Sequence, residues 1–235
     1  MRTPLTLSII ITATTMLLQG CSNDNDVSPF SLGVSDSTQF QIDVTNLTHN
    51  QAISPVAVIL HRSSYQPFTV GATASSALEV LAEEGNNDPF LNEASANEAV
   101  LDTAAGAAAI TPGDSERFML TGIVSADKLS LAGMMVNTND GFAALNSADL
   151  SQLSAGNSVI FHANVFDAGT EANDEMAGNL PGQGGEGLND ARNDRNFVIV
   201  HPGVIGMMDG LATSALDQSY RFDNPAVKVE VTRLQ

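Results

Sequence analysis

Several residue types that common functions depend on are scarce in this sequence of 235 residues. A single cysteine excludes a disulfide framework and a cysteine-rich zinc site. Tryptophan is absent and aromatic residues make up 5%, so the chain offers no large aromatic stacking surface. Only 9 Lys and Arg stand against 27 Asp and Glu, and the net charge of −18 argues against electrostatic binding of nucleic acid or anionic lipid. An acidic excess suits solubility and the capture of cations.

The first twenty residues have the character of an export signal. Arg2 supplies one positive charge, and the apolar stretch from Leu5 to Leu18 is too short and too rich in threonine for a comfortable membrane span. The sole cysteine, Cys21, directly follows Leu17-Leu18-Gln19-Gly20. This end resembles a bacterial lipobox, in which the signal is cleaved before the cysteine and the cysteine is lipidated.

The lipobox resemblance implies a simple organisation of the chain. Residues 1–20 are the signal peptide, 21–37 are the lipidated Cys21 with a polar, flexible tether, and 38–235 are the folded domain. Ser22 in place of an aspartate implies sorting to the outer membrane, with the protein facing the periplasm or the cell surface. The alternative is an ordinary secreted protein whose only cysteine falls here by chance.

Short strand patterns dominate the remaining sequence. Phe40, Ile42 and Val44 alternate with polar residues, which predicts a half-buried strand, and the apolar run 55–61 is typical of a strand buried on both faces. Further strands are predicted over 117–124, 129–136, 158–166, 197–201 and 226–234. One short helix is predicted over 76–84 with Gly85 as its stop, while 86–114 and the acidic stretch 167–196 are predicted as long connections.

This order of elements favours one fold class. Strands and helices do not alternate regularly, so a doubly wound parallel sheet is disfavoured. The pattern predicts an all-β protein, an antiparallel β-sandwich with one short helix and long acidic loops.

Short motifs spread over residues 38–234 resemble a known family. They are Val44-Thr45-Asn46, Ser54-Pro55 ahead of His61, Phe68 with Gly71, Ala74-Ser75, Leu81 to Gly85, Asn139-Asp140-Gly141-Phe142, Phe166-Asp167-Ala168-Gly169-Thr170-Glu171, His201-Pro202-Gly203 and the last strand. In this order they resemble the spondin domain of F-spondin, mindin and a set of bacterial lipoproteins. The resemblance implies a β-sandwich with a calcium ion in loops at one end. The animal domains carry cysteines and tryptophans that this chain lacks, so their partner surfaces are not carried over.

Asp140, Asp167 and Glu171 are the candidate metal ligands. Calcium prefers about six to eight hard oxygen ligands from carboxylates, carbonyls and water. Asp167 and Glu171 are four residues apart in a glycine-containing loop, so both can reach one ion, and the family resemblance implies that Asp140 joins them. Backbone carbonyls, with Asn139 or Thr170, would complete the shell. The alternative is a set of solvated loop acids.

A second acidic group, Asn173-Asp174-Glu175, precedes a glycine-rich stretch that runs to Asp190. It could extend the first site or hold a second ion, but a solvated flexible loop is favoured. The four histidines are His49, His61, His162 and His201, and no two have the spacing of metal ligands on one element. A zinc site from His61, His201 and a carboxylate is a disfavoured alternative.

The motifs contain no Gly-x-Ser-x-Gly nucleophile elbow, and we assign no catalytic residues. We expect a calcium-stabilised, envelope-anchored binding or adhesion module without enzymatic activity. Its expected partners are the membrane, through Cys21, and an extracellular protein or glycan, but not nucleic acid. Two alternatives remain. One is a surface-anchored hydrolase using loop carboxylates such as Asp140 and Asp167; the other is a purely structural envelope lipoprotein.

Overall fold

The computed structural model describes residues 37–123, 128–188 and 191–235, so the predicted signal, the lipobox and nearly all of the tether lie outside the described residues. The strands are β1 (Ser37–Asn46), β2 (Ala57–His61), β3 (Val100–Ala105), β4 (Ser115–Ile123), β5 (Lys128–Met134), β6 (Gly141–Asp149), β7 (Ser158–Asp167), β8 (Ile199–Val200) and β9 (Val227–Arg233). The helices are α1 (Ser76–Glu84) and α2 (Asp88–Ser95), with 3-10 turns η1 (Ala177–Asn179), η2 (Pro181–Gln183), η3 (Met207–Asp209) and η4 (Gln218–Tyr220). None of the helices in these ranges is long and apolar enough to cross a bilayer.

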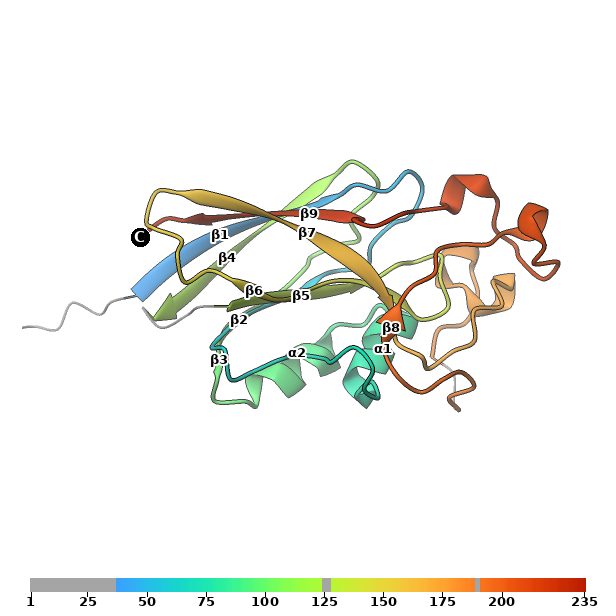
Figure 1. The fold of residues 1–235 in the computed structure, drawn as a ribbon, viewed down its shortest axis with the longest axis horizontal. Coiled ribbons are helices and arrows are strands. Elements are labelled where there is room, and N and C mark those ends of the chain that lie inside the picture. Colours follow the sequence, from blue (N-terminus) through green and yellow to red (C-terminus); the bar gives the residue numbers. More distant parts are fainter. Residues whose placement is uncertain (1–36, 124–127, 189–190) are drawn as a thin grey trace, which may run out of the picture. The chain divides into compact units, whose positions relative to one another are not determined.

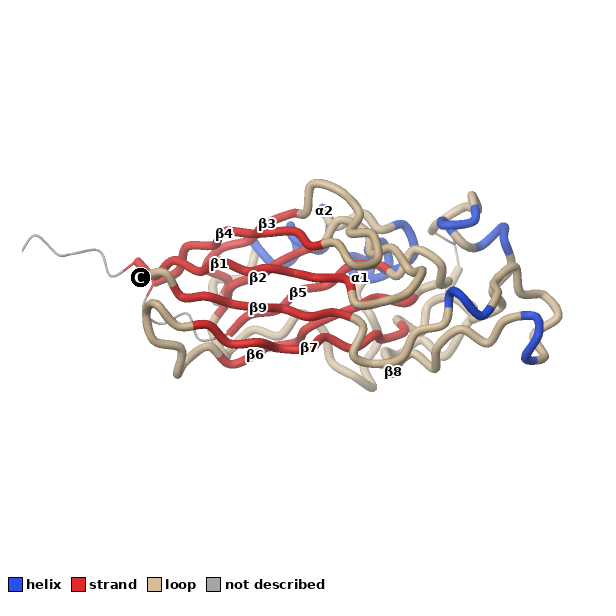
Figure 2. Tube along the Cα trace, turned by 90° about the horizontal axis from the view of Figure 1, so that it is seen from above, coloured by secondary structure: helices blue, strands red, loops and turns tan. Residues whose placement is uncertain are grey.

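All strand pairs are antiparallel, in the order β3-β2-β5-β6-β7-β9-β1-β4, and β8 pairs with the end of β7. Strand β7 belongs to both layers, because residues 158–163 pair with β9 and residues 164–167 pair with β6. The path therefore folds into a sandwich, with β4, β1 and β9 in one layer and β3, β2, β5 and β6 in the other (Figures 1 and 2). The outer edges meet where Asp102 Oδ2 accepts a hydrogen bond from the Thr121 N–H at 2.7 Å. The predicted all-β antiparallel class is confirmed.

Two apolar cores hold the layers together. The alternation in β1 places Phe40, Ile42 and Val44 in the core between the sheets, as predicted. In β2, Val58 and Leu60 join the same core, whereas Ile59 faces a second core beneath the helices. The prediction that this strand is buried on both faces is confirmed.

Helix α1 forms where the sequence predicts it. The Ser75 side chain accepts a hydrogen bond from the Leu78 N–H at 3.2 Å, which caps the first turn. Gly85 ends the helix with a φ of 71°, a conformation that glycine adopts without strain. The buried Leu78 and Leu81 pack in the second core, so α1 covers the outer face of the β2, β5 and β6 layer (Figure 1).

Two predictions about this region were wrong. Residues 86–114 do not form one long connection, because they contain helix α2 and strand β3, so the described chain has two α-helices instead of one. Pro89 in the first turn of α2 and the buried Phe90 and Leu91 are ordinary helix signals within a polar stretch. Strand β6 was not predicted either, since it is buried on both faces by small residues, with Ala143 in the core between the sheets and Ala144 in the second core.

Candidate metal centre

The candidate centre begins in the turn between β5 and β6. Thr138 Oγ1 donates a hydrogen bond to the Met135 carbonyl at 2.7 Å and accepts one from the Gly141 N–H at 3.0 Å, which closes the turn. A Cβ on Gly141 would lie 2.5 Å from Thr138 Oγ1, so the tight turn requires glycine here. Asp140 is thereby held at the first residue before β6.

Strand pairing brings the second acid beside the first. Gly141 pairs with Asp167, the last residue of β7, so the turn that holds Asp140 lies against the loop that follows Asp167. The Ala168 N–H donates to the Asp140 carbonyl at 3.2 Å. Asp140 Oδ2 then accepts hydrogen bonds from the N–H groups of Thr170 at 2.7 Å and Glu171 at 3.1 Å. The carboxylate of Asp140 therefore organises the loop that carries the other two predicted ligands.

The Asp167 carboxylate also shapes this loop. Oδ1 accepts a hydrogen bond from the Gly169 N–H at 2.8 Å, and Oδ2 accepts one from Asn173 Nδ2 at 2.6 Å. Gly169 has a φ of 71°, which turns the chain sharply after β7. The three predicted ligands are almost completely buried, with 0% exposure for Asp140, 0% for Asp167 and 1% for Glu171.

Burial disfavours the charged forms of Asp140 and Asp167. Desolvation raises the pKa of Asp140 to about 7; the charge of Asp167 adds to the shift, and the hydrogen bonds from Glu171 and Thr170 oppose it. Burial also raises the pKa of Asp167, against the hydrogen bonds from Asn173 and Gly169. A cation among the carboxylates would remove this penalty.

The donor set matches a hard cation in chemistry but only partly in geometry. Asp140 Oδ1 is buried and has no hydrogen-bond partner among the described residues, so it is an oxygen available to a ligand. However, no group of three or more His, Cys, Asp or Glu side chains in the described ranges is arranged to hold a metal ion. The reason is visible in the hydrogen bonds, because both Asp167 oxygens and Asp140 Oδ2 accept hydrogen bonds from groups of the loop after β7. Ligation by three carboxylates requires at least one of these side chains to turn.

The two neutral residues expected to complete the shell have other contacts. Asn139 Oδ1 accepts a hydrogen bond from the Glu175 N–H at 3.2 Å, and Asn139 Nδ2 donates to Asp174 Oδ1 at 3.1 Å. Thr170 Oγ1 lies 3.2 Å from Asp140 Oδ2, to which it donates. In this arrangement both side chains support the carboxylates and the loop.

The second acidic group is not the solvated loop that the sequence favoured. Glu175 is buried, and its carboxylate accepts hydrogen bonds from the N–H groups of Ile205 at 2.6 Å and Gly206 at 2.9 Å and from the Ser214 hydroxyl. Sequence reasoning missed this role because two of the partners are backbone groups about thirty residues away, which leave no pattern in the sequence.

The acidic stretch after β7 is attached at its far end through an arginine side chain. Arg192 forms a two-pronged ion pair with Glu79 of α1, with Nε–Oε1 at 2.8 Å and Nη2–Oε2 at 2.7 Å. The same guanidinium donates to the Ala74 carbonyl at 3.0 Å and to Asn196 Oδ1 at 2.8 Å. The stretch is thus attached to the helix layer, so its described part is folded onto the domain.

The two buried histidines lie in separate networks. His61 bonds to the Arg62 carbonyl through Nδ1 and to Ser130 Oγ through Nε2, each at 2.8 Å. His201 Nδ1 accepts a hydrogen bond from the Gly203 N–H at 2.9 Å, and burial lowers the pKa of His201 to about 4. Both nitrogens of His61 are used by nearby groups, whereas His201 Nε2 is buried without a hydrogen-bond partner among the described residues. Because neither ring belongs to a group of three or more metal-binding side chains in the described ranges, the alternative of a shared zinc site is weakened.

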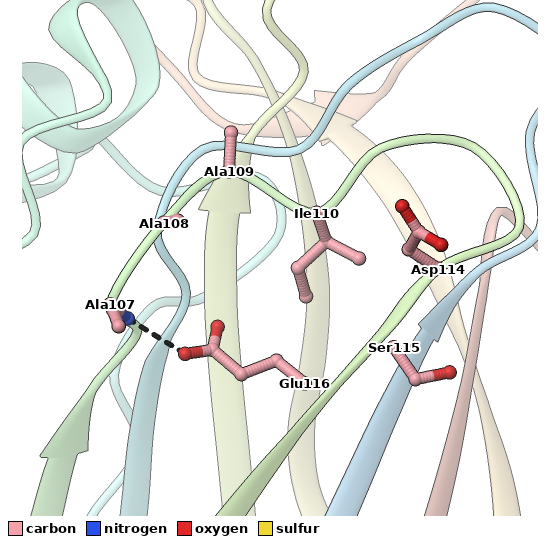
Figure 3. Close-up of a pocket in the computed structure, with 7 residues that line it drawn as sticks. All are labelled: Ala107, Ala108, Ala109, Ile110, Asp114, Ser115 and Glu116. Carbon is pink, nitrogen blue, oxygen red and sulfur yellow. Dashed lines mark hydrogen bonds between the residues drawn. The ribbon is translucent and has the colours of Figure 1, made fainter.

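A surface depression of about 320 Å³ lies apart from these acids, between residues 107–110 and the start of β4 (Figure 3). Glu116 Oε1 accepts a hydrogen bond from the Ala107 N–H at 2.7 Å at its wall (Figure 3). Its described lining contains Ser115 and two acids but neither a histidine nor a predicted metal ligand. The depression therefore offers no Ser-His-Asp arrangement.

Comparison with known proteins agrees with this architecture. The Spondin_N family model matches residues 37–181, a range that covers more than half of the chain and includes Asp140, Asp167 and Glu171. No match is found among curated proteins. The match confirms the family suggested by the motifs around His61, Asp140 and Asp167. The chain therefore belongs to the spondin N-terminal domain family.

Proposed function

We propose that this chain is an envelope-anchored binding module of the spondin type whose loop end is stabilised by a calcium ion. Membership of the family suggests an extracellular module of the binding or adhesion type. The observation that carries the calcium proposal is the buried carboxylate of Asp140, which lies beside Asp167 and keeps Oδ1 without a hydrogen-bond partner among the described residues. The residues that would hold the ion are Asp140, Asp167 and Glu171.

A calcium ion here would stabilise the loops instead of binding a partner directly. The three acids are at most 1% exposed, so an ion between them is enclosed and cannot present an open coordination position to a partner. When bound, calcium supplies positive charge that compensates buried carboxylates and links the turn before β6 to the loop after β7. The same burial argues against the hydrolase alternative, because substrate carboxylate chemistry requires access from solvent.

The anchor proposal rests on the sequence around Cys21 and on where the chain enters the domain. Thr232 of β9 pairs with both Gln41 of β1 and Ser158 of β7, so β1 and β7 start at the same end of the sandwich. Asp167 is nine residues further along β7, about 30 Å at the usual rise per residue. Strand β1 therefore begins at the end of the domain opposite the acidic cluster (Figure 1).

Calcium is expected to raise the melting temperature of the full-length chain in mild detergent after treatment with EDTA. A ligand that binds only the folded state at about a hundredfold excess over Kd adds about 2.7 kcal/mol. For a domain of this size such a gain corresponds to a rise of roughly 5–10 °C. Circular dichroism or calorimetry measures the rise, and magnesium serves as the comparison ion.

Matched variants separate the site from general charge effects. Asp167→Asn with Glu171→Gln should abolish the calcium response, whereas Glu93→Gln with Glu98→Gln, which removes two exposed acids, should keep it. An unchanged melting temperature with either ion in the wild-type chain would remove calcium from the proposal.

Cys21→Ser is expected to abolish lipidation and to move the protein from the membrane fraction to the soluble or unprocessed pool. The physical reason is that acyl chains on the cysteine supply the anchoring, since each buried CH₂ contributes about 0.8 kcal/mol. Fractionation and metabolic labelling with a radioactive fatty acid measure the effect, and Ser22→Ala is the neighbouring control. Labelling that persists in Cys21→Ser would contradict the anchor.

A further inference from the structure

Glu175 holds a segment that lies after the family match. We name residues 202–216 the tip segment. The Glu175 carboxylate accepts hydrogen bonds from the Ile205 and Gly206 N–H groups and from the Ser214 hydroxyl, and the Glu175 carbonyl accepts one from the Ala215 N–H at 2.8 Å. Both halves of the tip segment are therefore attached to one residue.

The backbone of Glu175 is itself unusual. Its φ is 52°, in the left-handed region that residues other than glycine rarely adopt. Such conformations persist only where surrounding contacts enforce them, and they concentrate at clamps and switches. Asp174 reinforces the attachment, because its carbonyl accepts a hydrogen bond from Thr213 Oγ1 at 2.8 Å.

Three hydrogen bonds connect this clamp to the acidic cluster. Asn139, the neighbour of Asp140 in the chain, accepts the Glu175 N–H at 3.2 Å and donates to Asp174. Asn173 donates to Asp167 Oδ2 at 2.6 Å. The three residues 173–175 thus contact both the turn before β6 and the end of β7, the two places that the proposed ion would join.

The tip segment has little packing of its own. Its buried apolar residues are Val204 and Leu216, which form a small cluster with Leu180. It exposes Ile205 at 41%, Met207 at 57% and Met208 at 81%. With so small a core, the conformation of the segment depends on polar contacts, which include those made by Glu175 and an ion pair between Asp209 and Arg221 at 3.2 Å.

We propose that Glu175 is a positioning residue through which a divalent cation at the acidic cluster fixes the conformation of the tip segment and the display of its exposed apolar side chains. The inference rests on the calcium site proposed above. Without a cation, the buried charges of Asp140 and Asp167 repel each other and loosen the turn and the loop that hold residues 173–175. With the cation bound, both are fixed, and the hydrogen bonds of Glu175 transmit that order to the tip.

Amide hydrogen exchange followed by mass spectrometry tests the coupling in the full-length chain in detergent. Calcium added after EDTA should slow exchange in residues 167–175 and, by at least tenfold, at the amides of Ile205 and Gly206. Glu175→Gln should leave the tip exchanging rapidly with or without calcium while residues 167–171 remain calcium-protected. Glu186→Gln, which removes an exposed acid, is the matched control and should behave as wild type.

The outcomes separate this inference from the proposed calcium site. Protection of residues 167–171 without any change in the tip segment would overturn the coupling and leave the calcium site standing. No calcium effect in either region would overturn both. Ser214→Ala removes only one hydroxyl from the clamp and is the milder variant should Glu175→Gln fail to fold; tip exchange equal to wild type in Ser214→Ala and in any folded Glu175→Gln would overturn the role of Glu175.

Discussion

Asp140→Asn is expected to stabilise the domain in EDTA far more at pH 8 than at pH 4. Burial and the nearby Asp167 raise the folded-state pKa of Asp140 to about 7 from its ordinary value of 3.8. At pH values between the unfolded and the folded pKa of Asp140, the folded protein binds more protons than the unfolded chain. The free energy of unfolding therefore falls as the pH rises through this range. The full effect is at most about 4 kcal/mol, and asparagine avoids it because it carries no charge.

Denaturant unfolding of both proteins from pH 4 to pH 8 measures this effect as a difference. The subtraction is needed because burial lowers the pKa of His201 to about 4, which makes stability rise with pH over part of the same range. That contribution is common to both proteins and cancels. Asp223→Asn, at an exposed position, serves as the control. A constant difference between Asp140→Asn and wild type at every pH would show that Asp140 ionises at an ordinary pH.

Gly169→Ala is expected to destabilise the domain by roughly 2–5 kcal/mol, from strain at positive φ and from overpacking. Gly169 has a φ of 71°, and a Cβ there would meet the backbone of Phe197, 2.7 Å from its nitrogen and closer still to its carbonyl oxygen. The opposing atoms are backbone atoms of the segment that leads into β8, so they cannot rotate away. The Asn196 N–H also donates a hydrogen bond to the Gly169 carbonyl at 2.7 Å, which holds the two loop segments together.

Gly156→Ala provides the matched comparison for this substitution. Gly156 has a φ of 79°, but nothing lies within 4 Å of a Cβ placed there. It should cost only about 1–2 kcal/mol, the conformational penalty alone. Chemical denaturation of both variants isolates the steric contact with Phe197. Equal losses in the two variants would show that the loop after β7 has room to move.

The sequence predicts an element well where its residues pack against a single core or where its ends carry clear capping residues. Strands β1 and β9 each bury alternate residues against a single core, so period two is visible in the chain. Helix α1 has both a serine cap and a glycine stop. Strand β3 lies at the edge of the sheet and is only partly buried, so its residues show no clear alternation.

The candidate site likewise has parts that the sequence predicts and parts that it does not. Short motifs predict Asp140 and Asp167 as site residues, and strand pairing brings them together across 27 positions of sequence. The surroundings could not be predicted, because they consist of backbone donors such as the Thr170 and Glu171 N–H groups. Glu175 illustrates the limit, since its burial is decided by the path of residues 202–216 and not by any neighbour in sequence.

The position of β9 between β1 and β7 sets the order in which the domain can be completed during synthesis. Strand β1 is made first and β9 last, yet the two are hydrogen-bonded neighbours. Until residues 227–233 emerge, β1 and β7 each keep an edge without its partner, and such long-range pairing is slow to form. The described sheet therefore cannot be completed until its last strand has been made.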